Sequence, residues 1–306
     1  MPDKILFVNS TEPQCGIHQF GKRVGSMIKE SNKYEFLYLT TDNWNTFIQT
    51  IMTYDIKAVI FNYYPATMPW ISHHLLNQLN IPKLALYHEL PITGFDYYIH
   101  LDPTFFESGN RFTTGRPLFE YNKTFSLPTI PVIGSFGFGF HNKGYHRIVQ
   151  QVQEEFDEAI IRLHIPFAHF GDQYGESARG IGDYCKSLVH KPNVRIEVTH
   201  HFMEDEQILD FLAQNTINCF FFDNMYGRGI SSSTDYALSV KRPIAITGMG
   251  WMFRHIRNIS PTICIEYASL KWIIDNGNTP LEPYQQLWSK QNTIKDYERI
   301  LDNVLK

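Results

Sequence analysis

Two loops in the second half of the sequence carry residue types that bind phosphate. In the first, GSFGFGFHNKG (134–144), Gly137 and Gly139 precede Lys143. Glycines let backbone amides approach an anion closely, a helix N-terminus favours negative charge, and a lysine adds a point charge. The spacing matches neither the GxGxxG dinucleotide fingerprint nor the GxxxxGK[ST] loop. The residues alone leave two interpretations open, an anion-binding loop and a plain strand-to-helix turn.

The second loop, YGRGISSST (226–234), follows the most apolar segment of the chain. Its guanidinium, amide and hydroxyl donors could contact phosphate, and they belong to Arg228, Gly229, Ser231 and Ser232. Asp235, one turn into the next helix, could accept hydrogen bonds from ribose hydroxyls. The alternative is structural, with serines capping the helix and Asp235 complementing its dipole. Two such loops in one domain indicate a diphosphate ligand.

Further candidates lie beside the predicted strands of the first half. Gly16, in the turn after the first strand, would let a ligand approach the backbone, although a turn glycine is the alternative. His88 ends a predicted strand, where it either faces a ligand or is hydrogen-bonded within its loop. His18 and Glu89 are weaker candidates, with structural and solvated roles as their alternatives.

Alternating apolar and amphipathic segments predict the elements that position these loops. Strands are expected at 4–10, 34–40, 57–64, 83–89 and 97–102, then at 129–136, 159–167, 194–200, 217–223, 242–248 and 261–266. Helices are expected at 15–31, 43–54, 69–79, 144–156, 181–188, 204–215 and 231–240, and in the tail from residue 281. Continuous apolar strands separated by helices predict α/β architecture with two Rossmann-like, doubly wound domains facing a cleft.

The expected domains are 1–126 and 127–285, followed by a C-terminal helix, 286–306. The chain has 306 residues, 43% of them hydrophobic and 19% charged, which predicts a folded two-domain protein. Lysine and arginine are not clustered and the net charge is −4, which argues against nucleic-acid binding.

The cysteines and histidines do not have the spacing of metal sites. The four cysteines form no CxxC pair, and neighbouring histidines lack i, i+4 spacing, so no metal is expected. The N-terminus has no signal-peptide pattern and no apolar run reaches about 18 residues. We therefore expect a cytoplasmic protein with reduced thiols and no membrane span.

In order along the chain, these motifs resemble the GT-B glycosyltransferases, particularly the retaining family 4. GFGFHNKG (137–144) is similar to the family's G-R-L-x-x-x-K-G loop, and THHFMEDEQILDFLAQNTINCFFF (199–222) to the segment that leads to its apolar strand. YALSVKRPIAI (236–246) resembles the end of its E-x7-E helix and the strand after it. CGIHQFGKRVGSMI (15–28) and YHEL (87–90) resemble its first glycine loop and a strand end with histidine. The resemblance covers nearly the whole chain. It implies that 1–126 is the acceptor-side domain, with His18 and Glu89 as weak acceptor-side candidates, that 127–285 is the donor domain, and that the C-terminal helix 286–306 packs back on the first domain.

Three positions depart from the family pattern. Phe138 stands where the family has a basic residue, while Arg228 and Tyr236 stand at the two glutamate positions, with Asp235 one residue away. Arg228 could supply the positive charge that Phe138 does not.

The resemblance implies a glycosyltransferase for polysaccharide biosynthesis that uses a UDP- or GDP-sugar, with retention and without metal or cofactor. Lys143, Arg228 and the amides of 229–232 would stabilise the leaving diphosphate, and His88 would contact the donor sugar or assist the acceptor. The acceptor would be a glycan, a lipid-linked sugar or another hydroxyl compound, with peripheral membrane contact as a possibility. The alternatives are a nucleotide-sugar epimerase or hydrolase of the same fold and a non-catalytic binding module. The sequence leaves the donor, the acceptor and the oligomeric state open.

Overall fold

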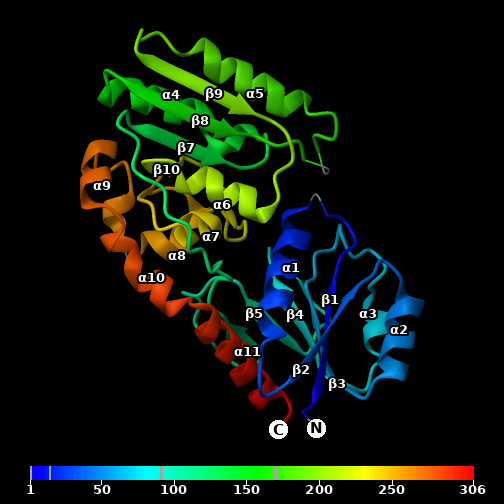
Figure 1. Cartoon of the computed structure of the whole chain (residues 1–306). Helices are drawn as coiled ribbons and strands as arrows, with labels where there is room; N and C mark the ends of the chain where they lie inside the picture. Colours follow the sequence, from blue (N-terminus) through cyan, green and yellow to red (C-terminus); the bar gives the residue numbers. More distant parts are fainter. Residues whose placement is uncertain (1, 14, 90–91, 169–170, 259) are drawn as a thin grey trace. The chain divides into compact units, whose positions relative to one another are not determined.

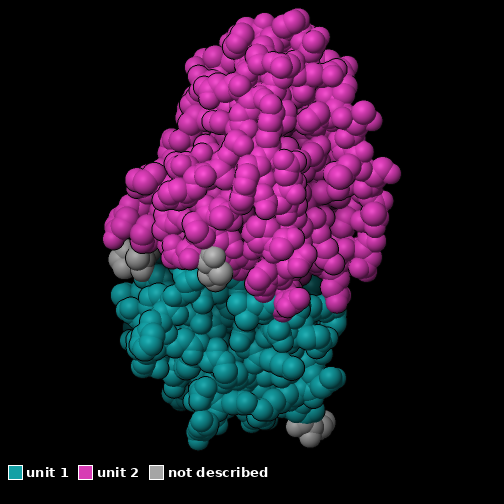
Figure 2. Space-filling view, turned by 90° about the vertical axis from the view of Figure 1, so that its left-hand side faces the viewer, with its two compact units in different colours: residues 1–117, 227–230, 287–306 teal, residues 118–226, 231–286 magenta. Residues whose placement is uncertain are grey.

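The computed structural model describes residues 2–13, 15–89, 92–168, 171–258 and 260–306. The chain forms two compact units, shown in separate colours in Figure 2. Unit 1 comprises residues 1–117, 227–230 and 287–306, and unit 2 comprises residues 118–226 and 231–286. The division after residue 117 comes earlier than the expected boundary at 126. The short segment 227–230, expected in the donor domain, belongs to unit 1.

Unit 1 is built on a six-stranded parallel sheet with strand order β2-β1-β3-β4-β5-β6 (Figure 1). The strands are β1 (Lys4–Asn9), β2 (Glu35–Thr40), β3 (Ile56–Phe61), β4 (Lys83–Tyr87), β5 (Tyr97–His100) and β6 (Arg111–Thr113). The helices are α1 (Gly16–Ile28), α2 (Trp44–Thr53), α3 (His73–Leu76) and α11 (Lys290–Val304). Since β2 and β3 flank β1, the strand order reverses between β1 and β3, which is where such sheets bind ligands.

Both faces of the unit 1 sheet are buried, as the continuous apolar strands predict. Ile5 and Phe7 of β1 pack into the cluster that α1 and α11 cover. Leu6 and Val8 point to the opposite face, into the cluster that α2 and α3 cover. The residues of α11 in the first cluster are fully or almost fully buried, namely Tyr297, Ile300, Leu301 and Val304. The C-terminal helix therefore forms part of the core of unit 1.

Unit 2 contains a five-stranded parallel sheet with strand order β11-β10-β7-β8-β9. The strands are β7 (Val132–Phe136), β8 (Ala159–His164), β9 (Val194–Thr199), β10 (Ile217–Phe220) and β11 (Ile244–Ile246). The helices are α4 (Tyr145–Glu155), α5 (Glu176–Ser187), α6 (Asp205–Ala213), α7 (Ser233–Ser239), α8 (Arg254–Arg257), α9 (Leu270–Asn276) and α10 (Glu282–Leu287). Helices α4, α5 and α9 pack on one face of the sheet. In this sheet the order reverses between β7 and β10.

Two expected elements differ in the structure. Residues 261–266 do not form a strand, because Pro261 begins a 3₁₀ turn (Pro261–Ile263) and only Cys264 bridges to Ile246 of β11. The helix expected at 69–79 is reduced to α3, which begins where the Ser72 side chain accepts a hydrogen bond from the amide of Leu75.

Candidate functional site

Two buried asparagines lie at the ends of adjacent strands in unit 1, at the point where the strand order reverses. Asn9 ends β1, Asn62 directly follows β3, and neither side chain is exposed. The Asn62 amide nitrogen donates to Asn9 Oδ1 at 2.7 Å and to the carbonyl of Ile17 at 2.7 Å. Asn9 in turn donates to the carbonyl of His18 at 3.0 Å. The pair therefore ties both strand ends to the first turn of α1.

His88 joins this network from the neighbouring strand. It directly follows β4, its ring is only partly exposed, and its Nε2 lies 2.6 Å from Asn62 Oδ1. The edge of the Phe20 ring meets the imidazole, with centroids 5.3 Å apart. Burial, with a smaller contribution from the charge of Arg116, lowers the pKa of His88 to about 3. His88 is therefore neutral at physiological pH. Leu90, the last residue of the YHEL motif, lies outside the described residues.

The segment 227–230 packs on the same strand end. Arg228 Nε lies 2.9 Å from Glu89 Oε1, and the Tyr64 hydroxyl donates to Glu89 Oε2 at 3.4 Å. A Cβ atom at Gly229 would clash with the carbonyl oxygen of His88, so only glycine allows this approach. The close backbone contact and the ion pair explain why Arg228 and Gly229 belong to unit 1 and not to the expected donor domain.

The other two candidates of the first half lie at the start of α1. Gly16 is the first helical residue and is exposed, and a Cβ atom there would touch nothing. Its position therefore favours a simple turn over a sterically required glycine. His18 Nδ1 lies 2.6 Å from the carbonyl oxygen of Ser10, so this nitrogen carries the proton. No side chain caps the N-terminus of α1 among the described residues.

In unit 2, the loop 137–144 lies at the reversal point of the sheet. Gly144 has a left-handed φ of 64°, and a Cβ atom there would clash with the carbonyl oxygen of Phe221 just after β10. The amide of Asp223 donates to the carbonyl of Asn142 at 2.8 Å. Gly139 approaches the first turn of α5, where a Cβ atom would lie 2.5 Å from the Ala178 Cα. These glycines are required by close backbone packing.

The side chains of this loop point in different directions. Lys143 places its ammonium 3.8 Å from the centroid of the Phe222 ring, at the end of the neighbouring strand. Tyr145 donates a hydrogen bond of 2.5 Å to the carbonyl of Gly137, and burial raises the pKa of this phenol. Phe138 is partly exposed and lies 6.5 Å from the Phe140 ring. The loop is thus held rigidly, with Lys143 beside β10.

Side chains of the serine run at the start of α7 make hydrogen bonds within unit 2. The amide of Ser233 donates to Ser231 Oγ at 3.4 Å, and Thr234 Oγ1 donates to the carbonyl of Ser231 at 2.8 Å. Ser232 occupies the N-cap position, but its side chain makes no capping hydrogen bond. Asp235 lies in the first helical turn with no solvent exposure. These positions favour the structural interpretation of Ser231 and Asp235.

The structure thus brings the candidates together in two groups. His88, Glu89, Arg228 and Gly229 meet at the end of β4 in unit 1, whereas Gly137, Gly139 and Lys143 share the β7 loop of unit 2. Sequence reasoning missed Asn9 and Asn62. The available signal was an asparagine at the end of each of two apolar runs, in VNS and FNY.

A second histidine is buried at the end of β8. His164 is 1% exposed, and its Nδ1 lies 2.8 Å from Thr199 Oγ1. Burial lowers its pKa to about 3, and the nearby His201 and His200 act in the same direction. This group lies at the carboxyl edge of the unit 2 sheet, but away from the reversal point between β7 and β10.

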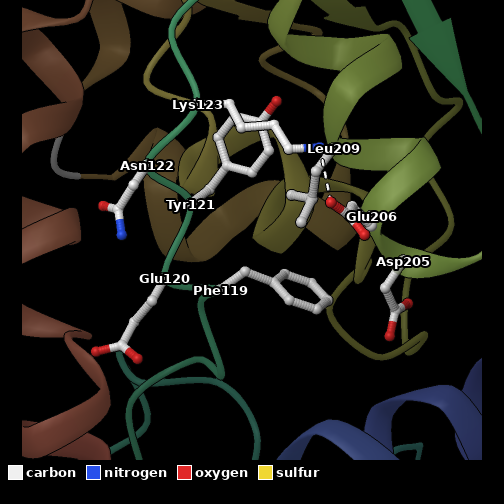
Figure 3. Close-up of a pocket in the computed structure, with 8 residues that line it drawn as sticks. All are labelled: Phe119, Glu120, Tyr121, Asn122, Lys123, Asp205, Glu206 and Leu209. Carbon is white, nitrogen blue, oxygen red and sulfur yellow. Dashed lines mark ion pairs between the residues drawn. The ribbon is translucent and has the colours of Figure 1, made fainter.

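Unit 2 also has a pocket of about 490 Å³ beside α6 (Figure 3). It is lined by Phe119, Glu120, Tyr121, Asn122, Lys123, Asp205, Glu206 and Leu209. Lys123 lies 2.7 Å from Glu206 and 2.9 Å from Asp210, and the Tyr121 hydroxyl donates to Asp210 at 2.7 Å. Lys123 is thus paired with two acidic side chains, and the pocket lining carries more acidic than basic groups.

Two other kinds of site are not formed by the described residues. No group of three or more histidine, cysteine, aspartate or glutamate side chains is placed to hold a metal ion there. None of the helices in the described part of the chain is long and apolar enough to span a bilayer.

Comparison with solved structures identifies the architecture. Sucrose-phosphate synthase from Thermosynechococcus elongatus matches with a TM-score of 0.69 and 12% identity over 98% of both chains. A glycosyltransferase from Rickettsia africae matches with a TM-score of 0.66 and 11% identity over 100% of this chain and 99% of the other. The chain has the GT-B glycosyltransferase fold.

A third GT-B structure contains a nucleotide. HepE from Anabaena, solved in complex with UDP, matches with a TM-score of 0.63 and 11% identity over 98% of this chain and 99% of that one. No protein-family model matches the sequence, and no curated protein matches it. At these sequence identities, the structural likeness shows the GT-B fold and not the substrates of this chain.

Proposed function

We propose that the protein is a glycosyltransferase that takes its sugar from a nucleoside-diphosphate donor. The observation that carries this proposal is the match to GT-B structures along the whole chain, including one bound to UDP. It is supported by the position of the loop 137–144 at the reversal point of the unit 2 sheet, where doubly wound folds bind ligands. In unit 1, His88 and Glu89 lie at the carboxyl end of β4, next to the strand β3 that borders the reversal point.

In this proposal, the leaving diphosphate is stabilised by cations and backbone amides. Lys143 is the candidate in unit 2, because the rigid loop 137–144 holds it at the end of β7. Arg228 is the candidate in unit 1, where Glu89 orients its guanidinium. His88, neutral and partly exposed, is the candidate for contact with a sugar hydroxyl.

The finer parts of the proposal come from the family resemblance. They are retention of the anomeric configuration, catalysis without metal, and an acceptor that is a glycan, a lipid-linked sugar or another hydroxyl compound. Work in polysaccharide biosynthesis at the cytoplasmic side of a membrane would fit such an acceptor. The stereochemistry of the product, read from its anomeric proton coupling by NMR, tests retention.

Calorimetric titration of the full chain with UDP, GDP, ADP and their sugar conjugates tests the proposal. We expect one nucleoside diphosphate to bind, with affinity reduced in Lys143→Ala. Lys271→Ala is the matched control, because Lys271 also lies over a phenylalanine ring of unit 2, with 5.5 Å to the centroid of Phe156. Binding of none of these nucleotides would contradict the proposal and favour a non-catalytic module.

Incubation with the bound nucleotide-sugar separates the remaining alternatives. Transfer to an added sugar acceptor supports the transferase. Conversion of the donor to its epimer, or to free sugar and nucleotide at an undiminished rate without acceptor, would instead identify an epimerase or a hydrolase.

A further inference from the structure

The asparagine pair in unit 1 has a defined direction of hydrogen bonding. The amide of Ser10 donates to Asn9 Oδ1 at 3.0 Å, and Asn9 Nδ2 donates to the carbonyl of His18 at 3.0 Å. Backbone groups cannot exchange donor and acceptor, so they fix which end of the Asn9 amide is oxygen. The polarity of Asn9 is therefore set by the backbone around β1 and α1.

Asn9 and the backbone together set the orientation of Asn62. Asn62 Nδ2 faces two acceptors, Asn9 Oδ1 and the carbonyl of Ile17, so the nitrogen must occupy this position. A flipped Asn62 would place its oxygen against both of these oxygens in a site without solvent exposure. The atom that faces His88 is consequently Asn62 Oδ1, which can only accept a hydrogen bond.

The direction of this chain of bonds decides the tautomer of His88. Since Asn62 Oδ1 is an acceptor, His88 Nε2 must carry a proton to form the 2.6 Å bond. A neutral imidazole has one proton, so Nδ1 then holds a lone pair. Among the described residues none hydrogen-bonds to Nδ1, and this atom is not among the buried ones that lack a partner.

We propose that Asn62, supported by Asn9, is a positioning residue that holds His88 in the Nε2–H form and presents the Nδ1 lone pair to a hydroxyl group of the sugar substrate. This inference rests on the proposed function for the identity of the ligand. A lone pair attracts a hydroxyl donor and repels the oxygens of a phosphate or carboxylate. We call the chain of hydrogen bonds from Asn9 through Asn62 to His88 the relay. The relay therefore makes His88 selective for the sugar and not for the diphosphate.

Packing around the relay leaves it little freedom to rearrange. A Cβ atom at Gly21 of α1 would lie 2.5 Å from Asn9 Oδ1 and would also clash with the Asn62 amide. The Phe20 ring of α1 contacts the imidazole of His88, and the Arg116 guanidinium lies over this ring. Burial lowers the pKa of His88 and so keeps its imidazole neutral. His88 therefore remains an uncharged acceptor over the physiological pH range and is a poor proton donor.

The first test needs no substrate. Long-range ¹H–¹⁵N NMR spectra of the full chain with ¹⁵N-labelled histidine report the tautomer, and the His88→Gln variant assigns the resonance. From pH 5 to pH 8 we expect an unprotonated Nδ1 and a protonated Nε2. A protonated Nδ1, either in the other tautomer or in an imidazolium, would overturn the inference, whatever any variant does.

The second test changes the relay without changing its volume. Asn62→Asp replaces Nδ2 by an oxygen that faces Asn9 Oδ1 and the carbonyl of Ile17. An ionised carboxylate there should give His88 a second proton near neutral pH, whereas a protonated carboxyl group would donate to these oxygens and leave the ring in its Nε2–H form. Asn218→Asp is the matched control, because Asn218 is also fully buried and accepts a 2.8 Å hydrogen bond from the amide of Asn215 in unit 2. It should leave the His88 spectrum unchanged. An ionised carboxyl group at position 62, seen from its ¹³C shift, beside a neutral His88 ring would overturn the inference, and so would an Nδ1–H ring beside either form of the carboxyl group.

Ligand affinity separates this inference from the proposed function. At a pH where the spectrum shows a charged His88 in Asn62→Asp, this variant should bind the nucleotide-sugar about 2- to 12-fold more weakly, the loss of one hydrogen bond, and should not weaken binding further in a His88→Gln background. The free nucleoside diphosphate should bind both proteins equally. If the wild-type tautomer is as expected but no sugar is transferred, the relay stands and the transferase proposal fails. An equal loss for sugar-bound and free nucleotide would overturn the assignment to the sugar.

Discussion

Replacing Arg228 with glutamate should weaken nucleotide binding far more than it weakens the fold. The Arg228 side chain is 50% exposed and that of Glu89 is 23% exposed, and their closest atoms are 2.9 Å apart. An ion pair of this exposure contributes roughly 0.2–1 kcal/mol to the free energy of unfolding. The Arg228→Glu variant should therefore unfold in urea with a stability loss of about 1 kcal/mol, somewhat more than loss of the pair alone because of charge repulsion.

The effect on binding should be larger. A hydrogen bond from a charged group contributes roughly 1.5–3 kcal/mol, so its loss raises the dissociation constant about 10- to 150-fold. Isothermal titration of the nucleoside diphosphate that binds wild-type protein measures this change, with urea unfolding of the same samples. Glu89→Arg/Arg228→Glu is the control that separates the two roles. It restores an ion pair but moves the cation to the end of β4, so stability should recover while affinity does not.

Two results would refute this reasoning about Arg228. Affinity of Arg228→Glu within a factor of two of wild type would mean that the guanidinium does not meet the ligand. Recovery of affinity in the charge-swapped double variant would mean that only the ion pair with Glu89 matters.

Three further predictions concern the loops and histidines. Gly144→Ala should destabilise unit 2 by about 2–5 kcal/mol in urea unfolding, from the left-handed backbone and the clash with Phe221, whereas Gly180→Ala in α5, where a Cβ atom meets nothing, should be neutral or stabilising. Tyr145→Phe should lower the free energy of unfolding by about 1 kcal/mol through loss of its bond to the Gly137 carbonyl, and an unchanged midpoint would show that this bond contributes nothing. Because the pKa of His88 is about 3 when folded against 6.5 ordinarily, the unfolded chain binds the extra proton first, and stability falls as the pH drops from about 6.5 towards 3. His88→Gln should flatten the stability profile by up to about 1.4 kcal/mol per pH unit between pH 6 and pH 4, and an equal slope in both proteins would contradict the lowered pKa.

Much of the fold could be predicted because its signals are local. The strands that form both sheets, such as KILFVNS and INCFFFD, are apolar along their whole length, which is typical of strands buried on two faces. Segment 261–266, PTICIE, also has apolar residues at its centre, yet it turns at Pro261. Periodicity cannot separate a strand from a buried turn when the run is this short.

The candidate site was predictable only in part, for a similar reason. Glycines and a lysine next to each other in the sequence marked the loop 137–144, and the structure holds them at the reversal point of the unit 2 sheet. Asn9 and Asn62 are 53 positions apart, and Asn62 and His88 are 26 apart. Only the strand order β1-β3-β4 makes these three residues neighbours.

The sequence by itself determined the class of fold, since apolar strands and amphipathic helices are properties of short segments. The tertiary structure alone decided the assignment of 227–230 to unit 1, the pairing of Arg228 with Glu89 and the neutral state of His88. The physical reason is that ion pairs, hydrogen-bond direction and desolvation depend on which distant segments meet. No local pattern in the chain encodes those meetings.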